Sequence, residues 1–169
     1  MTTKGETAVE TFLRDRKFIG NSDSDNDESL SYFKAIYAEP PQRASRKNFP
    51  RIMIRQINGP FEQRGVGDYT TVKQRALIQI SVYIRVDNKP TWTFWDGTTI
   101  PAVRAGTKIA EHIAKLILTH ALDIAEENDN EVCFDGAGDI TQPPAPGIES
   151  LDNVDVYRTD LNTFWNVWL

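Results

Sequence analysis

The chain has 169 residues, of which 40% are hydrophobic and 25% charged, and these proportions are ordinary for one soluble globular domain. Its net charge of −5 and pI near 5.1 argue against a nucleic-acid coat protein, because such proteins present a basic surface to the phosphate backbone. The single cysteine excludes an internal disulfide framework, and no apolar run approaches the ~20 residues that a membrane span needs. We therefore expect one domain over residues 1–169, in a soluble protein made in the cytoplasm.

The N-terminal part predicts a helix, a loop and one undecided segment. Thr3 and Glu6 have the spacing of a capping box, so a short amphipathic helix is expected over about residues 5–17. Residues 21–29 are acidic and small, which is typical of a solvated loop. Residues 31–38 are aromatic and apolar, and they fit a helix or a strand equally well.

The strongest pattern is the alternation from Gln74 to Asp87, where every second residue is apolar. It predicts a long strand with one face on a core and the other toward water or a partner. Residues 49–57 are also strand-like, and we expect them to pair with the long strand as an antiparallel hairpin joined by a loop. Since strands usually have about five or six residues, this length indicates a structural or assembling sheet rather than an enzyme pocket.

The next two elements are a hairpin and the main helix. The pair Asp96-Gly97 is a favourable two-residue turn, so its flanks, residues 91–95 and 98–103, predict a small aromatic hairpin. Apolar residues then recur at three- and four-residue steps over about residues 108–124. They predict one amphipathic helix whose apolar stripe lies across the sheet.

The C-terminal part predicts an extended loop followed by two strands. Residues 142–147 are rich in proline and cannot supply a regular ladder. Strands are expected near residues 154–159 and 163–168. The large apolar residues at the chain end predict that this end is docked in the sheet or on a partner, because termini otherwise fray.

An acidic segment only partly resembles a calcium loop. Asp23, Asp25 and Asp27 match its first, third and fifth ligands, but Glu28 stands where the loop needs Gly and Lys34 where it needs a bidentate Glu. A plain acidic loop is therefore the favoured interpretation.

Other candidates for chemistry are weak. His112 and His120 lie about 12 Å apart along one predicted helix, which is too far to share a metal. Cys133 has no nearby His or basic sequence context, so we expect a buried or half-buried thiol rather than a nucleophile. The glycine pairs at 65–67 and 136–138 lack the rest of a phosphate-binding motif and predict turns. We expect no catalytic residue, no metal site and no cofactor.

Three sets of side chains are candidates for subunit or partner contacts. The first is a basic loop, which could instead be solvated or meet a phosphate backbone. The second is the aromatic hairpin, which could instead stack on sugars or bases or form a flap on the core. The third is the apolar C-terminal segment. Their members are Arg43, Arg46 and Lys47; Trp92, Phe94 and Trp95; and Phe164, Trp165 and Trp168.

Four segments, taken in order, carry a likeness to a known family: RALIQISVYIR (75–85), KIAEHIAKLI (108–117), VYR (156–158) and FWNV (164–167). The order and character of the elements over about residues 48–169 resemble the tail terminator, or tail completion, proteins of tailed viruses of bacteria or archaea. That family has no fixed motif. The aromatic hairpin, the acidic loop and the proline-rich loop depart from its pattern.

The resemblance implies an α+β fold: an antiparallel or mixed twisted sheet with one long strand, packed by one main amphipathic helix and a short N-terminal helix. It also implies a structural virion protein, not an enzyme, whose hexameric ring caps the tail tube and meets the head connector or neck protein. DNA would pass through the ring without specific binding, and neither a cofactor nor a membrane is implied. Three alternatives stay open: another neck or tail adaptor, a small aromatic-platform module that binds carbohydrate or nucleic acid, and a small enzyme with an unrecognised site.

Overall fold

The computed structural model describes residues 3–17, 33, 35–38, 49–57, 61–64, 71–85, 91–94, 97–141, 148–151 and 154–168. These residues combine helices with a mixed sheet, so the expected α+β class is confirmed. The helices are α1 (Lys4–Lys17), α2 (Ala102–Thr119) and α3 (Ala121–Glu127). The strands are β1 (Ala35–Tyr37), β2 (Arg51–Ile57), β3 (Phe61–Arg64), β4 (Thr71–Arg85), β5 (Thr91–Thr93), β6 (Thr99–Pro101), β7 (Val132–Thr141), β8 (Ile148–Leu151) and β9 (Val154–Trp168).

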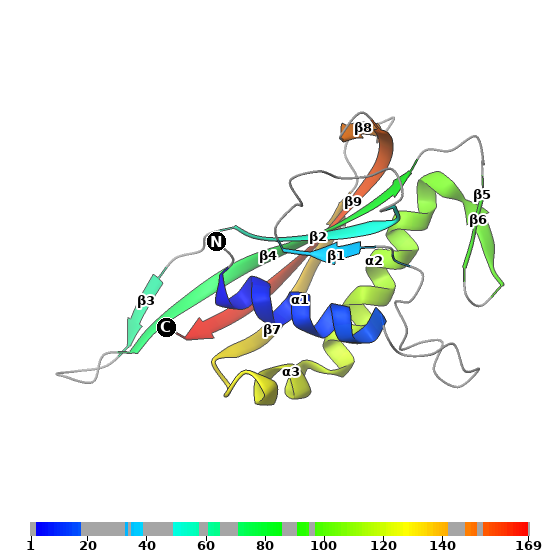
Figure 1. Cartoon of the computed structure of the whole chain (residues 1–169). Helices are drawn as coiled ribbons and strands as arrows, with labels where there is room; N and C mark the ends of the chain where they lie inside the picture. The colour runs from blue at the N-terminus through cyan, green and yellow to red at the C-terminus, as the bar shows by residue number, and fades with distance from the viewer. Residues whose placement is uncertain are drawn as a thin grey trace.

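The main sheet has the strand order β1-β2-β4-β9-β7 (Figure 1). Strand β1 runs parallel to β2, and the other neighbours are antiparallel. Strand β3 pairs with the start of β4 at one end of the sheet, and β8 pairs with the start of β9 at the other. The strands β5 and β6 form a separate hairpin beside α2.

The centre of the sheet is the pair β4 and β9, each 15 residues long. They pair continuously from Lys73 opposite Trp168 to Arg85 opposite Val156. The predicted long strand is thus confirmed, as is its antiparallel pairing with the strand that precedes it. The two predicted closing strands form the single strand β9. The polar residues Asp160 and Asn162, which separate them in the sequence, both face β4 side chains that donate hydrogen bonds to them.

All three helices contribute to a core on one face of the sheet. Their apolar residues, such as Leu13 of α1 and Ile109 of α2, are fully buried against Ile78 of β4 and Leu161 of β9. The core formed by these buried side chains provides the main hydrophobic stabilisation of the subunit. None of the helices in the described residues is long and apolar enough to cross a membrane.

The main helix differs from its predicted form in two ways. It begins at Ala102, directly after β6, and it ends at Thr119 rather than near residue 124. The backbone of His120 leaves helical geometry there, with φ −106° and ψ 20°, and the chain continues as the short helix α3. The smaller hairpin is confirmed, with Gly97 in its turn at φ 79°.

Several other segments correct or complete the sequence-based expectations. The undecided segment contains strand β1, and the loop expected after β2 contains β3. Residues 136–138, expected to form a turn, lie in β7, whose register shifts between Phe134 and Gly136 and again between Ala137 and Ile140. A Cβ at Gly138 would come within 3.0 Å of Cε2 of Phe164, so glycine here lets the two strands approach. The acidic segment 21–29, with its calcium-like pattern, the glycine pair 65–67 and the proline-rich segment 142–147 lie outside the described residues.

The N-terminal helix is tied to the sheet through the carboxylate of Glu6, which is 8% exposed. The predicted capping box is present: the Thr3 N–H donates to Oε2 of Glu6 (2.7 Å), and the Glu6 N–H donates to Oγ1 of Thr3 (3.2 Å). The other oxygen, Oε1, accepts the backbone N–H of Gln56 in β2 (2.6 Å). Both oxygens of this carboxylate therefore receive backbone donors.

We expect Glu6→Gln to lower the free energy of unfolding by about 1 to 3 kcal/mol, because the new amide NH₂ would face a backbone N–H that then lacks an acceptor. Urea unfolding followed by circular dichroism measures the loss. The matched control is Glu10→Gln on the same helix, where the carboxylate pairs only with Arg14 in an i,i+4 ion pair (3.3 Å), and its effect should stay within about 0.5 kcal/mol. Equal midpoints for the two variants would contradict this account.

Candidate functional site: the outer face of the sheet

The face of the sheet turned away from the helices is the candidate site, and we call it the outer face. The even-numbered residues of β4 from 74 to 84 are buried on the helix side, so its odd-numbered residues form the outer face. The cross-strand register adds the even-numbered residues of β9 and the odd-numbered residues of β2. The outer face therefore spans the three central strands.

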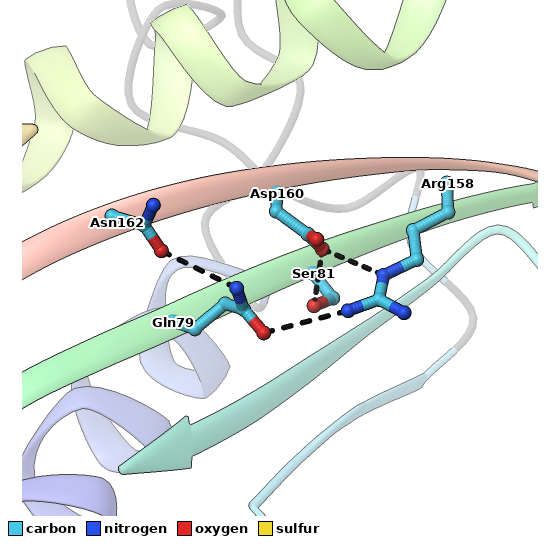
Figure 2. Close-up of polar contacts among 5 residues, drawn as sticks. All are labelled: Gln79, Ser81, Arg158, Asp160 and Asn162. Carbon is cyan, nitrogen blue, oxygen red and sulfur yellow. Dashed lines mark hydrogen bonds and ion pairs between the residues drawn. The ribbon is translucent and has the colours of Figure 1, made fainter. Parts of the chain in front are cut away.

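A polar network lies at the middle of the outer face (Figure 2). Asp160 of β9 accepts Oγ–H of Ser81 (2.6 Å) and Nε–H of Arg158 (2.8 Å) on the same oxygen, Oδ1. The amide of Gln79 donates to Asn162 (3.3 Å) and accepts from Nη2 of Arg158 (3.4 Å). These bonds join β4 to β9 and fix the register of the pair.

The network fits a structural role better than catalysis. Ser81 and Asp160 are both buried, so a substrate would have little access to the hydroxyl or to the carboxylate that accepts its hydrogen bond. The two histidines belong to α2 and to its junction with α3, on the other side of the sheet, where His120 bonds Asp123 (2.8 Å) and lies against Phe12. Among the described residues, no group of three His, Cys, Asp or Glu side chains could hold a metal ion.

One end of the outer face is closed around a buried cation. Arg51 is 2% exposed, and its guanidinium carbon lies 4.5 Å from the ring centre of Phe49 and 5.7 Å from that of Tyr83. Nη1 of Arg51 also donates to the hydroxyl of Tyr37 (3.1 Å). The cation–π contacts with these rings and the hydrogen bond to the phenol oxygen offset part of the free-energy cost of removing the guanidinium from water.

The other end of the outer face is open and apolar. Ile57 pairs with Leu77, and Leu77 pairs with Phe164, so these three side chains make a row across β2, β4 and β9 that we call the outer row. Ile57 is 42% exposed, and Leu77 and Phe164 are half-buried. Next to the row, Arg75 lies over the ring of Phe164 (5.5 Å) and forms an ion pair with Asp135 of β7 (3.2 Å).

The outer face is basic although the protein is acidic. Outward positions of β2, β4 and β9 carry a single carboxylate, that of Asp160. The cationic side chains at such positions are Arg51, Arg55, Lys73, Arg75, Arg85 and Arg158. Arg75 pairs with Asp135 of β7, Arg158 pairs with Asp160, and Arg51 is buried, so the remaining positive charge of this face is that of Arg55, Lys73 and Arg85. This remaining charge favours an anionic partner.

The predicted C-terminal contact residues divide between the two faces. Phe164 and Trp168 are half-buried on the outer face, where Nζ of Lys73 lies 5.7 Å from the ring of Trp168. Trp165 points the opposite way and is fully buried in the core, which agrees with the expectation that this chain end is docked in the sheet and leaves its ring inaccessible to a partner. The alternation of the strand explains this outcome, because adjacent residues must lie on opposite faces.

The aromatic hairpin is mainly a cover for the core. Phe94 is 4% exposed, with Nζ of Lys108 over its ring at 4.4 Å, which agrees with the alternative that the hairpin is a flap on the core. Trp92 is half-buried and packs against the same core. The remaining candidates, Trp95 and the basic loop of Arg43, Arg46 and Lys47, lie outside the described residues.

Ile57, Leu77 and Arg75 were not selected from the sequence as contact residues. The alternation of β4 placed Leu77 and Arg75 opposite the core-facing residues, but only the register across three strands shows that they adjoin Ile57 and Phe164. No protein-family model matches the chain, and no curated protein matches it. Functional conclusions therefore depend on this geometry.

Proposed function

We propose that the protein is a tail terminator: a structural subunit of a virion that assembles as a ring, caps the tail tube and joins it to the head connector. The observation that carries the proposal is the outer face, on which two 15-residue strands present an apolar row with a cationic border. A soluble monomer gains nothing from such a face, whereas a ring subunit buries it against a neighbour. The order of strands and helices over residues 48–169 adds the family resemblance to this physical argument.

A closed ring sets a specific demand on its subunit. Each copy must use two different surfaces, one to receive the preceding copy and one to reach the following copy. The outer face supplies a surface distinct in charge and composition from the helix layer. The same demand applies to any ring-forming neck or tail adaptor at another position along the virion axis.

A nucleic-acid binding module is the second candidate, favoured by the cations and aromatic side chains of the outer face. Single-stranded nucleic acids bind to such sheets by stacking bases on exposed rings within a positively charged groove. Here, however, Arg75 lies over the ring of Phe164 and Lys73 over that of Trp168. A base would have to displace these cations from the rings before it could stack there.

The test of the terminator proposal is deletion of the protein from the virus that encodes it. We expect tails of uncontrolled length, or tails without heads, in electron micrographs, because nothing would then stop addition of tube subunits. An image of the intact particle should place the protein as a ring between the tube and the head connector. Normal infectious particles after deletion would overturn the proposal.

The second candidate is tested on the purified chain with a labelled single-stranded oligonucleotide. Salt-dependent binding by the isolated monomer, lost in Arg75→Glu, would favour the nucleic-acid module over the ring protein. Oligonucleotide binding by the Arg85→Glu variant, measured under the same conditions, controls for the change of net charge. Arg85 is exposed at the end of β4 that lies far from the outer row.

A further inference from the structure

Exposed apolar side chains lie at three places on the described part of the subunit. Among the described residues, the large apolar side chains classed as exposed are Ile57 (42%), Val103 (40%), Leu118 (67%) and Leu122 (79%). Ile57 belongs to the outer row. Leu118 and Leu122 lie at the junction of α2 and α3, in the helix layer.

The two leucines lie on either side of this junction. The His120 N–H bonds the carbonyl of Leu116 (3.0 Å), and the Ile124 N–H bonds the carbonyl of His120 (3.0 Å), so the last turn of α2 and the first turn of α3 meet at His120. Leu118 and Leu122 lie two residues before and two residues after this point, and both are exposed. We call these two side chains the apolar knob.

The surroundings of this knob are acidic. Residues 115–129 contain Asp123, Glu126, Glu127 and Asp129 and a single cation, Lys115, so the excess charge around the knob is negative. We call the knob and these carboxylates the α2–α3 corner. It is opposite in charge to the outer row, which is bordered by Arg55 on β2 and Arg75 on β4.

We propose that the α2–α3 corner of one subunit docks on the outer row of the next copy, with its leucines against Ile57, Leu77 and Phe164 and its carboxylates toward the bordering arginines. The occupant of the outer row is thus a second copy of this chain, selected by charge complementarity and by exposed apolar surface on both sides. This inference rests on the proposed function, for which it names the subunit contact.

The two patches lie in different layers of the subunit, the corner with the helices and the row on the sheet face turned away from them. Because the outer row faces away from the helix layer that carries the corner, we take the two patches to meet different copies, which makes the contact heterologous. Repetition of the contact generates a ring or a filament rather than a two-fold dimer.

Cross-linking of engineered cysteines tests the contact even when association is weak. In a Cys133→Ser background, Ile57→Cys and Leu122→Cys together give each subunit one thiol on the row and one on the corner. On mild oxidation we expect a ladder of disulfide-linked species larger than the dimer. A mixture of the two single-cysteine variants should stop at the heterodimer, because each copy then has one thiol.

The matched control replaces Leu122→Cys with Val103→Cys, which puts the second thiol at another exposed apolar position of the helix layer. This control should give no ladder above background. In the double-cysteine background, Glu126→Lys should slow cross-linking about tenfold, equivalent to about 1.4 kcal/mol of contact free energy. Adding Arg55→Glu should restore most of that rate by exchanging the two charges.

Three outcomes would overturn the inference: no ladder, an equal ladder from the Val103→Cys control, or no charge effect. If the ladder is absent and Arg55→Glu instead weakens oligonucleotide binding, the occupant of the outer row is nucleic acid. Failure of the proposed function gives a different result. If the cross-linked ladder forms but deletion of the protein leaves normal tails, the subunit contact is supported and the terminator function is rejected.

Discussion

Replacing Trp165 with alanine should lower the free energy of unfolding by about 3 to 5 kcal/mol, a large part of the net stability of about 5 to 15 kcal/mol of a typical domain. The side chain is fully buried, and its ring meets Phe134 of β7 nearly edge-on at 5.2 Å between centroids. Its Nε1–H donates to Oγ1 of Thr163 (2.8 Å), which in turn donates to the carbonyl of Ile78 (2.7 Å). Removal would leave a cavity and break this chain of hydrogen bonds.

The measurement is chemical unfolding followed by circular dichroism, with Trp168→Ala as the matched control. Trp168 lies in the same strand three residues later, but it is half-buried on the outer face. Its replacement should cost clearly less, because part of the ring is already in contact with water. Similar midpoints for the two variants would mean that the core does not depend on Trp165 as described.

Gly106→Ala should destabilise the protein by about 1 to 3 kcal/mol, although the same change in an exposed helix usually stabilises it by about 1 kcal/mol. At this point α2 crosses β9 so closely that a Cβ on Gly106 would lie 2.2 Å from Oγ1 of Thr159 and 3.0 Å from its Cβ. Thr159 is 1% exposed, so its side chain has no free space to occupy. The helix would have to move away from the sheet.

A double-mutant cycle with Thr159→Ala checks this explanation. The second substitution removes Oγ1, the closest clashing atom, so the double variant should be more stable than the sum of the two single effects predicts. The coupling free energy, obtained from four unfolding curves, should have a stabilising sign. Strictly additive effects would show that the overlap with Thr159 is not the cause.

The sequence was sufficient for elements that are determined locally. The capping box of Thr3 and Glu6 located the start of α1, strict alternation located β4, and the Asp96-Gly97 pair located the small hairpin. Each depends on residues close together in the chain. Their physical causes act before any tertiary contact exists.

Elements determined by distant neighbours could not be predicted in this way. The glycines of β7 resemble a turn, and only the proximity of Phe164 to Gly138 explains why glycine suits a strand there. Asp160 and Asn162 appear to interrupt a strand until β4 supplies Ser81 and Gln79 as their partners. Polar residues in a strand can be judged only with their cross-strand partners.

The candidate site shows the same division between local and distant information. Alternation alone separates Trp165 from Phe164 and Trp168, but it does not say which face the helices cover. That choice follows from packing, which buries Trp165 and leaves the other two rings on the outer face. Similarly, Phe94 belongs to the buried core and has Lys108 of α2 over its ring, and no local pattern encodes these contacts.

The pairing of β4 with β9 also has a consequence for how the protein is made. Ser81 and its partner Asp160 are 79 residues apart in the chain, so β4 leaves the ribosome well before the strand that completes its pairing. During that interval one edge of a long apolar strand is open to other nascent chains, and sheets joined by such distant contacts also form slowly. The newly made chain should consequently be most prone to aggregate before β9 is synthesised, and low temperature or chaperones should raise its soluble yield more than stabilising the finished fold would.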